Sequence, residues 1–250
     1  AEKAKRELED AKTELEKIVA SQSQDLEAKQ AGLALAQEQL TRIRKRIEGE
    51  GDYHGLIGTG SLLERIFKVV QRIKDTSIPV VIEGESGCGK DSLAKVIHEA
   101  GSRAHRPFVP VGCGAIPETL VESILFGHAK GAFSGADKDA PGIFSQASGG
   151  TIYFDNVGEM PKRLQVDLLR VLQEGAFTPL GSSRSIQADF RIICSSSDPL
   201  KKLVETGRLR EDLFFRLQVV TVVLPPLRDR MEDLPLLIKA FVNKIGRAHV

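Results

Sequence analysis

The sequence has no tryptophan, only two tyrosines and only three cysteines among its 250 residues. Cys88, Cys113 and Cys194 are odd in number and fit no metal-binding spacing, which indicates free thiols in a reducing cytoplasm. No hydrophobic run is long enough to span a bilayer and no secretory leader is visible, so we expect a cytoplasmic protein without a membrane partner. The net charge of +1 gives no global field that would attract nucleic acid.

Residues 1–48 differ from the rest of the chain, because they have almost no glycine or proline and are rich in Ala, Glu, Lys and Gln. Their apolar residues recur at alternating spacings of three and four, the a/d pattern of a coiled coil, with a change of phase at 21–24. This pattern favours a parallel dimeric stalk. The alternative is one solvated amphipathic helix that packs on its own domain.

The glycine-rich residues 49–60 are predicted to form a hinge, and an α/β pattern follows over 61–244. Helices are expected over 91–100 and from 161 through 172. Short apolar segments predict five strands, at 78–83, 108–111, 151–155, 190–194 and 219–224. Strands that alternate with helices indicate a parallel sheet covered on both faces.

A phosphate-binding loop follows the first of these strands. The segment GESGCGK matches the pattern GxxxxGK and lies between a predicted strand and a predicted helix, so a chance glycine-rich turn is disfavoured. Its backbone N–H groups and the helix N-terminus would surround phosphate oxygens, and Lys90 would reach the β and γ phosphates. Asp91 stands where the pattern expects Ser or Thr. The candidate nucleotide-binding residues are Gly84, Glu85, Ser86, Gly87, Cys88, Gly89, Lys90 and Asp91.

The segment GHAKGAFSGA, residues 127–136, resembles the GAFTGA loop of bacterial enhancer-binding proteins, the AAA+ activators of sigma-54 RNA polymerase. The resemblance runs from about residue 56 to about residue 238. The phosphate loop and the segments GGTIYFD, LLRVLQEG, GRLREDLFFRL and LPPLRDR occur in the family's order. A chance match of this length is disfavoured.

The resemblance implies an AAA+ P-loop NTPase core that binds ATP and Mg²⁺ and assembles as a ring, usually a hexamer. Hydrolysis in such rings moves a surface loop that grips the sigma-54 RNA polymerase holoenzyme and opens the promoter complex. In this chain Gly131 and Gly135 would be the hinges of that loop, and Phe133 would dock on the partner. Residues 179–190 resemble a second, supporting loop. The implied partner-binding residues are Gly131, Ala132, Phe133, Ser134, Gly135 and Ala136.

The resemblance also implies catalytic roles. Asp155 ends a strand and would hold Mg²⁺ together with Asp91, and Ile57 would be a further nucleotide contact. Arg210 and Arg216 match the arginines that the family donates to the ATP of a neighbouring subunit. The alternative is that both arginines pair locally with Glu211 and Asp212.

Four positions depart from the family. Asn156 replaces the glutamate that polarises the attacking water, and Gly112 and Ser197 replace asparagines that act as its switch and its sensor. Ala129 replaces a glutamate that helps to hold the loop. A neutral amide can orient water but cannot take its proton, and loss of a general base typically costs about a hundred- to ten-thousand-fold in rate. Hydrolysis is therefore expected to be slow.

Three functions stay open at this point. The chain is a slower but ordinary activator, in which Ser197, Asp91 or Glu159 positions the water, or it binds ATP without effective hydrolysis and donates arginines to a competent neighbour in a mixed ring. The third possibility is another AAA+ machine with a similar loop.

The family continues past this core with a small helical lid and usually a helix-turn-helix that binds DNA, and neither is present in the sequence given. We therefore expect DNA contact only through a C-terminal domain outside it. Residues 245–250 resemble a translated sequencing adapter, so we expect them to be non-native. Residues 1–48 resemble the linker that joins a sensory domain to the ATPase, and such a domain is expected upstream.

Overall fold

The structure of the protein is a computed structural model that describes residues 52–53, 56–58 and 60–247. The predicted coiled coil over 1–48 lies outside the described residues, as do residues 248–250 of the predicted non-native tail. The described residues belong to one compact unit.

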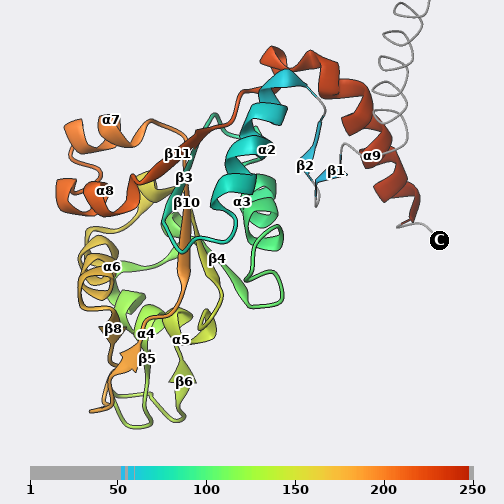
Figure 1. Ribbon diagram of the computed structural model, residues 1–250. Coiled ribbons are helices and arrows are strands. Elements are labelled where there is room, and N and C mark those ends of the chain that lie inside the picture. Colours follow the sequence, from blue (N-terminus) through green and yellow to red (C-terminus); the bar gives the residue numbers. More distant parts are fainter. Residues whose placement is uncertain (1–51, 54–55, 59, 248–250) are drawn as a thin grey trace, which may run out of the picture. The chain divides into compact units, whose positions relative to one another are not determined.

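A five-stranded parallel sheet forms the centre of this unit, in the order β11-β3-β10-β7-β4 (Figure 1). The strands are β3 (Val80–Glu83), β4 (Phe108–Gly112), β7 (Thr151–Asp155), β10 (Arg191–Ser196) and β11 (Val220–Val223). The five predicted strands are thus confirmed, within two residues at each end. Because β10 lies between β3 and β7, the carboxyl ends of these three strands meet at one edge of the sheet, where open α/β sheets bind ligands.

Helices cover both faces of the sheet, as the alternating pattern predicts (Figure 1). The helices are α2 (Ser61–Ile73), α3 (Lys90–Glu99), α4 (Val121–Phe126), α5 (Ile143–Gln146), α6 (Lys162–Glu174), α7 (Leu200–Glu205), α8 (Glu211–Leu217) and α9 (Leu234–Arg247). Single 3-10 turns are η1 (Cys113–Ala115), η2 (Glu118–Leu120), η3 (Val157–Glu159), η4 (Leu227–Asp229) and η5 (Met231–Asp233). Short antiparallel pairs join β1 (Asp52–Tyr53) to β2 (Leu56–Ile57), β5 (Gly127–His128) to β6 (Ala140–Pro141), and β8 (Ala176–Phe177) to β9 (Ile186–Gln187).

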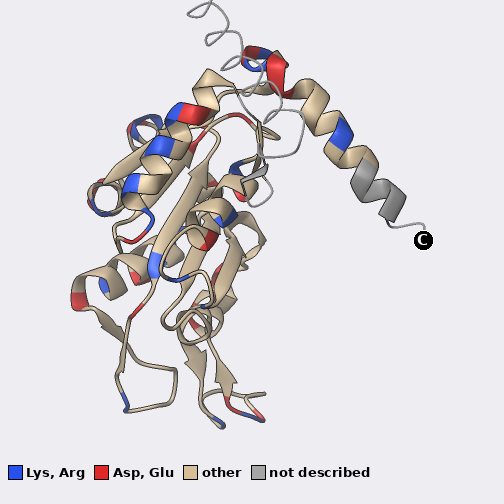
Figure 2. Cartoon of the chain, turned by 45° about the vertical axis from the view of Figure 1, so that its right-hand side comes forward, with Lys and Arg blue, Asp and Glu red and all other residues tan. Residues whose placement is uncertain are grey.

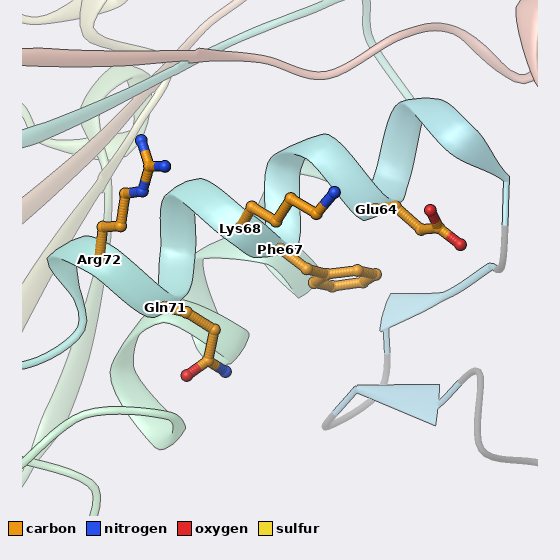
Figure 3. Close-up of a pocket in the computed structure, with 5 residues that line it drawn as sticks. All are labelled: Glu64, Phe67, Lys68, Gln71 and Arg72. Carbon is orange, nitrogen blue, oxygen red and sulfur yellow. The ribbon is translucent and has the colours of Figure 1, made fainter.

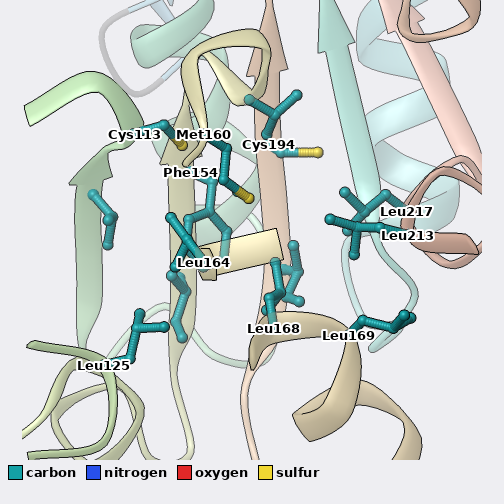
Figure 4. Packing of buried hydrophobic residues seen from close by; sticks show 14 of the residues in the cluster. Cys113, Leu125, Phe154, Met160, Leu164, Leu168, Leu169, Cys194, Leu213 and Leu217 are labelled. Atoms are coloured by element: carbon teal, nitrogen blue, oxygen red, sulfur yellow. The ribbon is translucent and has the colours of Figure 1, made fainter. Parts of the chain in front are cut away.

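Successive side chains of β3, β7 and β10 enter two different hydrophobic cores, because a strand alternates its side chains between faces. Phe154 and Cys194 belong to the core that includes Cys113, Met160 and the leucines of α6 and α8 (Figure 4). Tyr153 and Ile193 face the other way, into the core beneath α2 and α3. Tyr153 therefore points toward the side of the sheet on which the helix after the phosphate loop begins.

The predicted hinge over 49–60 includes residues that pack on this unit. Leu56 is 4% exposed and belongs to the core beneath α2 and α3, and the backbone N–H of Gly60 donates to the Asp233 carboxylate at 3.1 Å. The packed unit thus begins before Ser61. At the other end, α9 continues to Arg247, past the predicted native end near residue 244.

Basic and acidic residues are interspersed along the helices of the described part (Figure 2). This distribution agrees with the small net charge of the sequence. Among the helices that the structure describes, none combines the length and the apolar character needed to cross a membrane.

Arg191 joins the sheet to the last turn of α2. Its guanidinium is buried and donates hydrogen bonds to the carbonyl oxygens of Ile73 at 3.0 Å and Lys74 at 2.9 Å. These carbonyls have no partner inside the helix, and a cation at a helix C-terminus also interacts favourably with the helix dipole. Burial lowers the pKa of the Arg191 guanidinium, but this side chain stays charged in a folded protein.

We expect Arg191→Met to lower the free energy of unfolding by about 1–3 kcal/mol, because the Lys74 carbonyl oxygen loses its charged donor and the Ile73 carbonyl oxygen keeps only the hydrogen bonds from Thr76. Urea unfolding followed by circular dichroism measures the change. The exposed Arg170, whose i,i+4 pair with Glu174 is worth only about 0.3–0.5 kcal/mol, supplies the control variant Arg170→Met. Equal stability of the two variants would contradict the role assigned to Arg191.

Candidate functional site

The phosphate loop lies between β3 and α3, as predicted. Gly87 and Gly89 have φ of 78° and 100°, a left-handed conformation that residues with a side chain rarely adopt. Lys90 is buried, and its Nζ donates to the carbonyl oxygens of Gly84 at 2.8 Å and Glu85 at 2.9 Å. The loop thus curls around its own lysine, whose ammonium lies inside the predicted cradle.

Two arginines near the C-terminal end of the described chain hold this loop from outside. Arg228 forms a bidentate pair with the Glu85 carboxylate, at 2.6 and 2.7 Å, and this pairing lowers the pKa of Glu85. Arg230 is buried and donates to the carbonyl oxygen of Cys88 at 2.5 Å. Burial raises the pKa of the Cys88 thiol, which therefore stays protonated and packs as an apolar group.

The two predicted metal-binding acids lie close together. The Tyr153 hydroxyl is 2.6 Å from Oδ1 of Asp91 and 3.2 Å from Oδ1 of Asp155, so it links α3 to the end of β7. The Ser195 hydroxyl, on the neighbouring strand β10, donates to Asp155 Oδ1 at 2.7 Å. Burial and the hydrogen bond to Asp91 raise the pKa of Tyr153, so its hydroxyl remains a donor at neutral pH.

Asn156 has a strained backbone. Its φ of 57° and ψ of 69° are left-handed, and it is the one residue other than glycine with positive φ in the described part of the chain. Asparagine tolerates this conformation better than most residues. The Ser195 hydroxyl accepts its N–H at 2.8 Å, and its Nδ2 donates to Oε1 of Glu159 at 2.8 Å.

The remaining predicted nucleotide-site residues lie at or near the same edge of the sheet. Gly112 is the last residue of β4, and Ser197 directly follows β10 with an exposed side chain. Ile57 is half-buried in β2, and the neighbouring Leu56 lies 3.7 Å from the position a Cβ of Gly89 would take. The fold therefore brings the phosphate loop, both acids and Asn156 to one region.

Of the two predicted arginine fingers, Arg216 lies on α8 and Arg210 directly precedes it, and both are exposed. Arg210 is the N-cap residue of this helix, and its guanidinium pairs with Asp212 at 2.7 Å. In the single chain this arginine therefore forms the local ion pair that was the alternative to a finger. Among the described residues Arg216 forms no ion pair. An exposed pair such as Arg210–Asp212 is worth about 0–1 kcal/mol, so a stronger ligand could displace it.

The GAFSGA segment forms the loop between β5 and β6. Gly131 and Gly135 have φ of 82° and 100°, and the N–H of Gly131 donates to the carbonyl oxygen of Ala136 at 2.8 Å. The Phe133 side chain is 45% exposed, whereas Ala136 is 5% exposed and closes the base of the loop. Ala132 is half-buried, and Ser134 is exposed beside Phe133.

Two contacts position this loop. The ring of Phe133 packs edge-on against His128 with a centroid separation of 4.8 Å. The second predicted loop lies beside the GAFSGA loop. The N–H of Ala129 donates to the carbonyl oxygen of Leu180 at 2.9 Å, and the N–H of Leu180 donates to the carbonyl oxygen of Gly127 at 3.0 Å. The aromatic side chain is therefore presented to solvent from a fixed base.

A surface pocket of about 530 Å³ lies along α2, lined by Glu64, Phe67, Lys68, Gln71 and Arg72 (Figure 3). None of the predicted site residues lines it. In the described part of the chain no cluster of three or more His, Cys, Asp or Glu side chains could hold a metal ion by itself.

Sequence reasoning missed Tyr153 and Ser195, the two hydroxyl groups that position Asp155. Tyr153 lies in a strand that the sequence predicts, and Ser195 directly follows the predicted strand at 190–194. A hydroxyl in a buried strand needs a hydrogen-bonding partner. That requirement is the signal that points to these residues. It does not identify the partner.

Comparison with known proteins gives one family and several relatives. The model of the family described as "Sigma-54 interaction domain" matches residues 56–223. The DNA-binding transcriptional regulator NtrC of Bradyrhizobium sp. (strain RP501 Parasponia) is 46% identical over 212 residues, which are 85% of this chain and 44% of that protein. The chain thus spans less than half the length of this relative.

Crystal structures of NtrX from Brucella abortus have a similar fold. The structure in complex with ADP is 34% identical with a TM-score of 0.70, and the match covers 86% of this chain and 47% of that one. The structure in complex with ATP is 33% identical with a TM-score of 0.69, and the match covers 86% and 49% of the two chains.

The left-handed backbone of residue 156 predicts an unusual ranking of variants. We expect Asn156→Ala to be less stable than Asn156→Gly by about 1 kcal/mol, because a Cβ is disfavoured in this conformation. Urea unfolding of both proteins measures the difference.

Ser197 supplies the matched control, because its φ is not positive. There Ala should be the more stable of the two replacements, by about 0.4–1 kcal/mol, since glycine has the more flexible unfolded chain. The same order of stability at both positions would contradict the backbone geometry of Asn156.

Proposed function

Because the chain belongs to the family of sigma-54 interaction domains, we propose that it is the ATP-binding AAA+ part of an activator that remodels sigma-54 RNA polymerase to open promoters. The observation that carries this proposal is the exposed Phe133 on a loop held by the β5–β6 and β8–β9 hairpins. The same unit carries a complete phosphate loop. A nucleotide site and a docking loop on one compact unit are what such a motor needs.

Nucleotide binding is supported by the phosphate loop itself. Lys90 now donates to two carbonyl oxygens of the loop, and the phosphates of ATP would replace these acceptors. Loop N–H groups and the N-terminus of α3 would surround the remaining phosphate oxygens. The solved NtrX structures hold ADP or ATP in a fold of this kind, which supports ATP as the ligand.

The acids of the site suit Mg²⁺. Asp91 and Asp155 use their Oδ1 atoms for hydrogen bonds with Tyr153 and Ser195, which leaves Oδ2 of each for a cation or its water. Mg²⁺ usually binds one or two carboxylates together with phosphates and waters, so two acids suffice. When bound, the ion would neutralise charge on the phosphates.

A ring, usually a hexamer in this family, would place α8 beside the nucleotide of a neighbour. Arg210, at the start of α8, and Arg216, within it, are both exposed, which a donated finger requires. We also propose self-association through residues 1–48. DNA contact is assigned to a C-terminal domain outside this sequence.

Slow hydrolysis belongs to this proposal, because Asn156 carries no acid and neither Gly112 nor Ser197 supplies the amide found in the family. These same residues favour a second candidate, a subunit that binds ATP, scarcely hydrolyses it and donates arginines within a mixed ring. The retained phosphate loop and the exposed Arg216 are compatible with either candidate. A turnover measurement separates them.

The proposed function predicts nucleotide-dependent capture of sigma-54. We expect immobilised sigma-54 to retain this protein in the presence of a transition-state mimic of ATP, and much less in its absence. Phe133→Ala should weaken retention at least tenfold, because an aromatic anchor of an interface typically contributes about 2 kcal/mol or more.

Two variants serve as controls in this experiment. Lys90→Ala should bind a fluorescent ATP analogue about 10–100-fold more weakly, since hydrogen bonds from a charged group are worth about 1.5–3 kcal/mol, and should lose the mimic-dependent retention. Phe241→Ala removes another exposed phenylalanine, 61% exposed on α9, and should retain binding. The proposed function would be refuted if retention on sigma-54 were the same with and without the mimic and the same for the original chain and Phe133→Ala.

A further inference from the structure

A carboxylate lies directly beside the amide that replaces the family's acid. Asn156 Nδ2 donates to Glu159 Oε1 at 2.8 Å, and Glu159 is exposed to solvent. This hydrogen bond fixes the orientation of the amide, because only the NH₂ group can donate. The Asn156 Oδ1 and the second Glu159 oxygen therefore both remain available as acceptors toward water.

Gly114 has no side chain and so makes room for this carboxylate. A Cβ added to Gly114 would lie 2.3 Å from Glu159 Oε2, which is far closer than two such atoms can approach. Any residue with a side chain at this position would push the carboxylate away from where it lies. The absence of a side chain at Gly114 and the position of the Glu159 carboxylate are therefore linked.

The Glu159 carboxylate also acts on the buried thiol of Cys113 in η1. Burial raises the pKa of the Cys113 thiol, and the negative charges of Asp155 and Glu159 act in the same direction. Both carboxylates thus act electrostatically on the same thiol. Glu159 stands at the end of η3, one short turn beyond Asn156, and its backbone N–H donates to the Asn156 carbonyl oxygen at 2.9 Å.

We propose that Glu159 is the proton acceptor for ATP hydrolysis in this chain, with Asn156 orienting the attacking water and Gly114 making room for the carboxylate. The inference rests on the proposed function, from which it takes ATP as the substrate. It makes Glu159 a catalytic residue and Gly114 a positioning residue.

The chemical step balances with ATP and one water. Asn156 Oδ1 and Glu159 Oε2 accept the two hydrogens of the water, whose oxygen forms a bond to the γ-phosphorus. The bond between that phosphorus and the oxygen that bridges it to the β-phosphorus breaks, and ADP leaves with the electron pair. One proton of the water passes to Glu159 and then to solvent, which leaves ADP and phosphate.

The test is single-turnover phosphate release with saturating ATP and Mg²⁺, together with binding of a fluorescent ATP analogue by each protein. We expect Glu159→Gln to release phosphate at least a hundredfold more slowly, the usual effect of losing a general base, with nucleotide affinity changed less than twofold. Glu205→Gln removes another exposed glutamate, on α7, and should keep the original rate.

Gly114→Ala tests whether Gly114 acts through the Glu159 carboxylate and not through the stability of the fold. It should slow release at least tenfold in the original chain and have no further effect when Glu159 is already Ala, because the displaced carboxylate is then absent. Thermal unfolding checks that each variant folds.

The outcomes separate this inference from the proposed function. If the protein binds nucleotide and Glu159→Gln turns over at the original rate, the inference is overturned and nucleotide binding stands. If the protein binds nucleotide but releases no phosphate above the level of Lys90→Ala, the inference is also overturned, and the hydrolysis-impaired subunit becomes the better account. If no nucleotide binds, the proposed function itself fails.

Discussion

The parallel pairing of β7 with β10 is the constraint on which the site depends. Its register pairs Phe154 with Cys194, so the next residues along, Asp155 and Ser195, lie side by side at the carboxyl edge of the sheet. The Ser195 hydroxyl then serves two neighbours, as donor to Asp155 and as acceptor for the N–H of Asn156. A shift of the register by one residue would turn these side chains to opposite faces and separate them.

This pairing explains why an amide can occupy position 156. The hydrogen bond from the Asn156 N–H to the Ser195 hydroxyl helps to hold the Asn156 backbone in a left-handed conformation, in which the side-chain amide donates to Glu159. On the other side of Asp155, Tyr153 links the same carboxylate to Asp91 at the start of α3. The hydroxyls of Tyr153 and Ser195 thus position the carboxylates of Asp91 and Asp155 at the nucleotide edge of the sheet.

Much of the fold could be predicted from the sequence, because its signals are local. The apolar strands, the GESGCGK turn and the exposed GAFSGA segment can each be recognised from a short stretch of consecutive residues. The connections within the site could not be predicted in this way. Tyr153 and Asp91 are 62 residues apart and Ser195 and Asp155 are 40 apart, so only the order of strands in the sheet brings each pair together. The positive φ of Asn156 and the space at Gly114 are also consequences of tertiary packing.

We infer that the amide at the end of β7 limits the rate of hydrolysis, whereas the phosphate loop binds nucleotide normally. The most direct measurement compares the rate constant of phosphate release, at saturating ATP, for the original chain and for Asn156→Glu. We expect at least a tenfold faster rate when the acid is restored, with little change in nucleotide affinity, because an acid at the end of β7 would add to the proton transfer that we assign to Glu159. The left-handed backbone, which disfavours a glutamate by about 1–2 kcal/mol, limits the gain. Equal rates for the two proteins would contradict this inference.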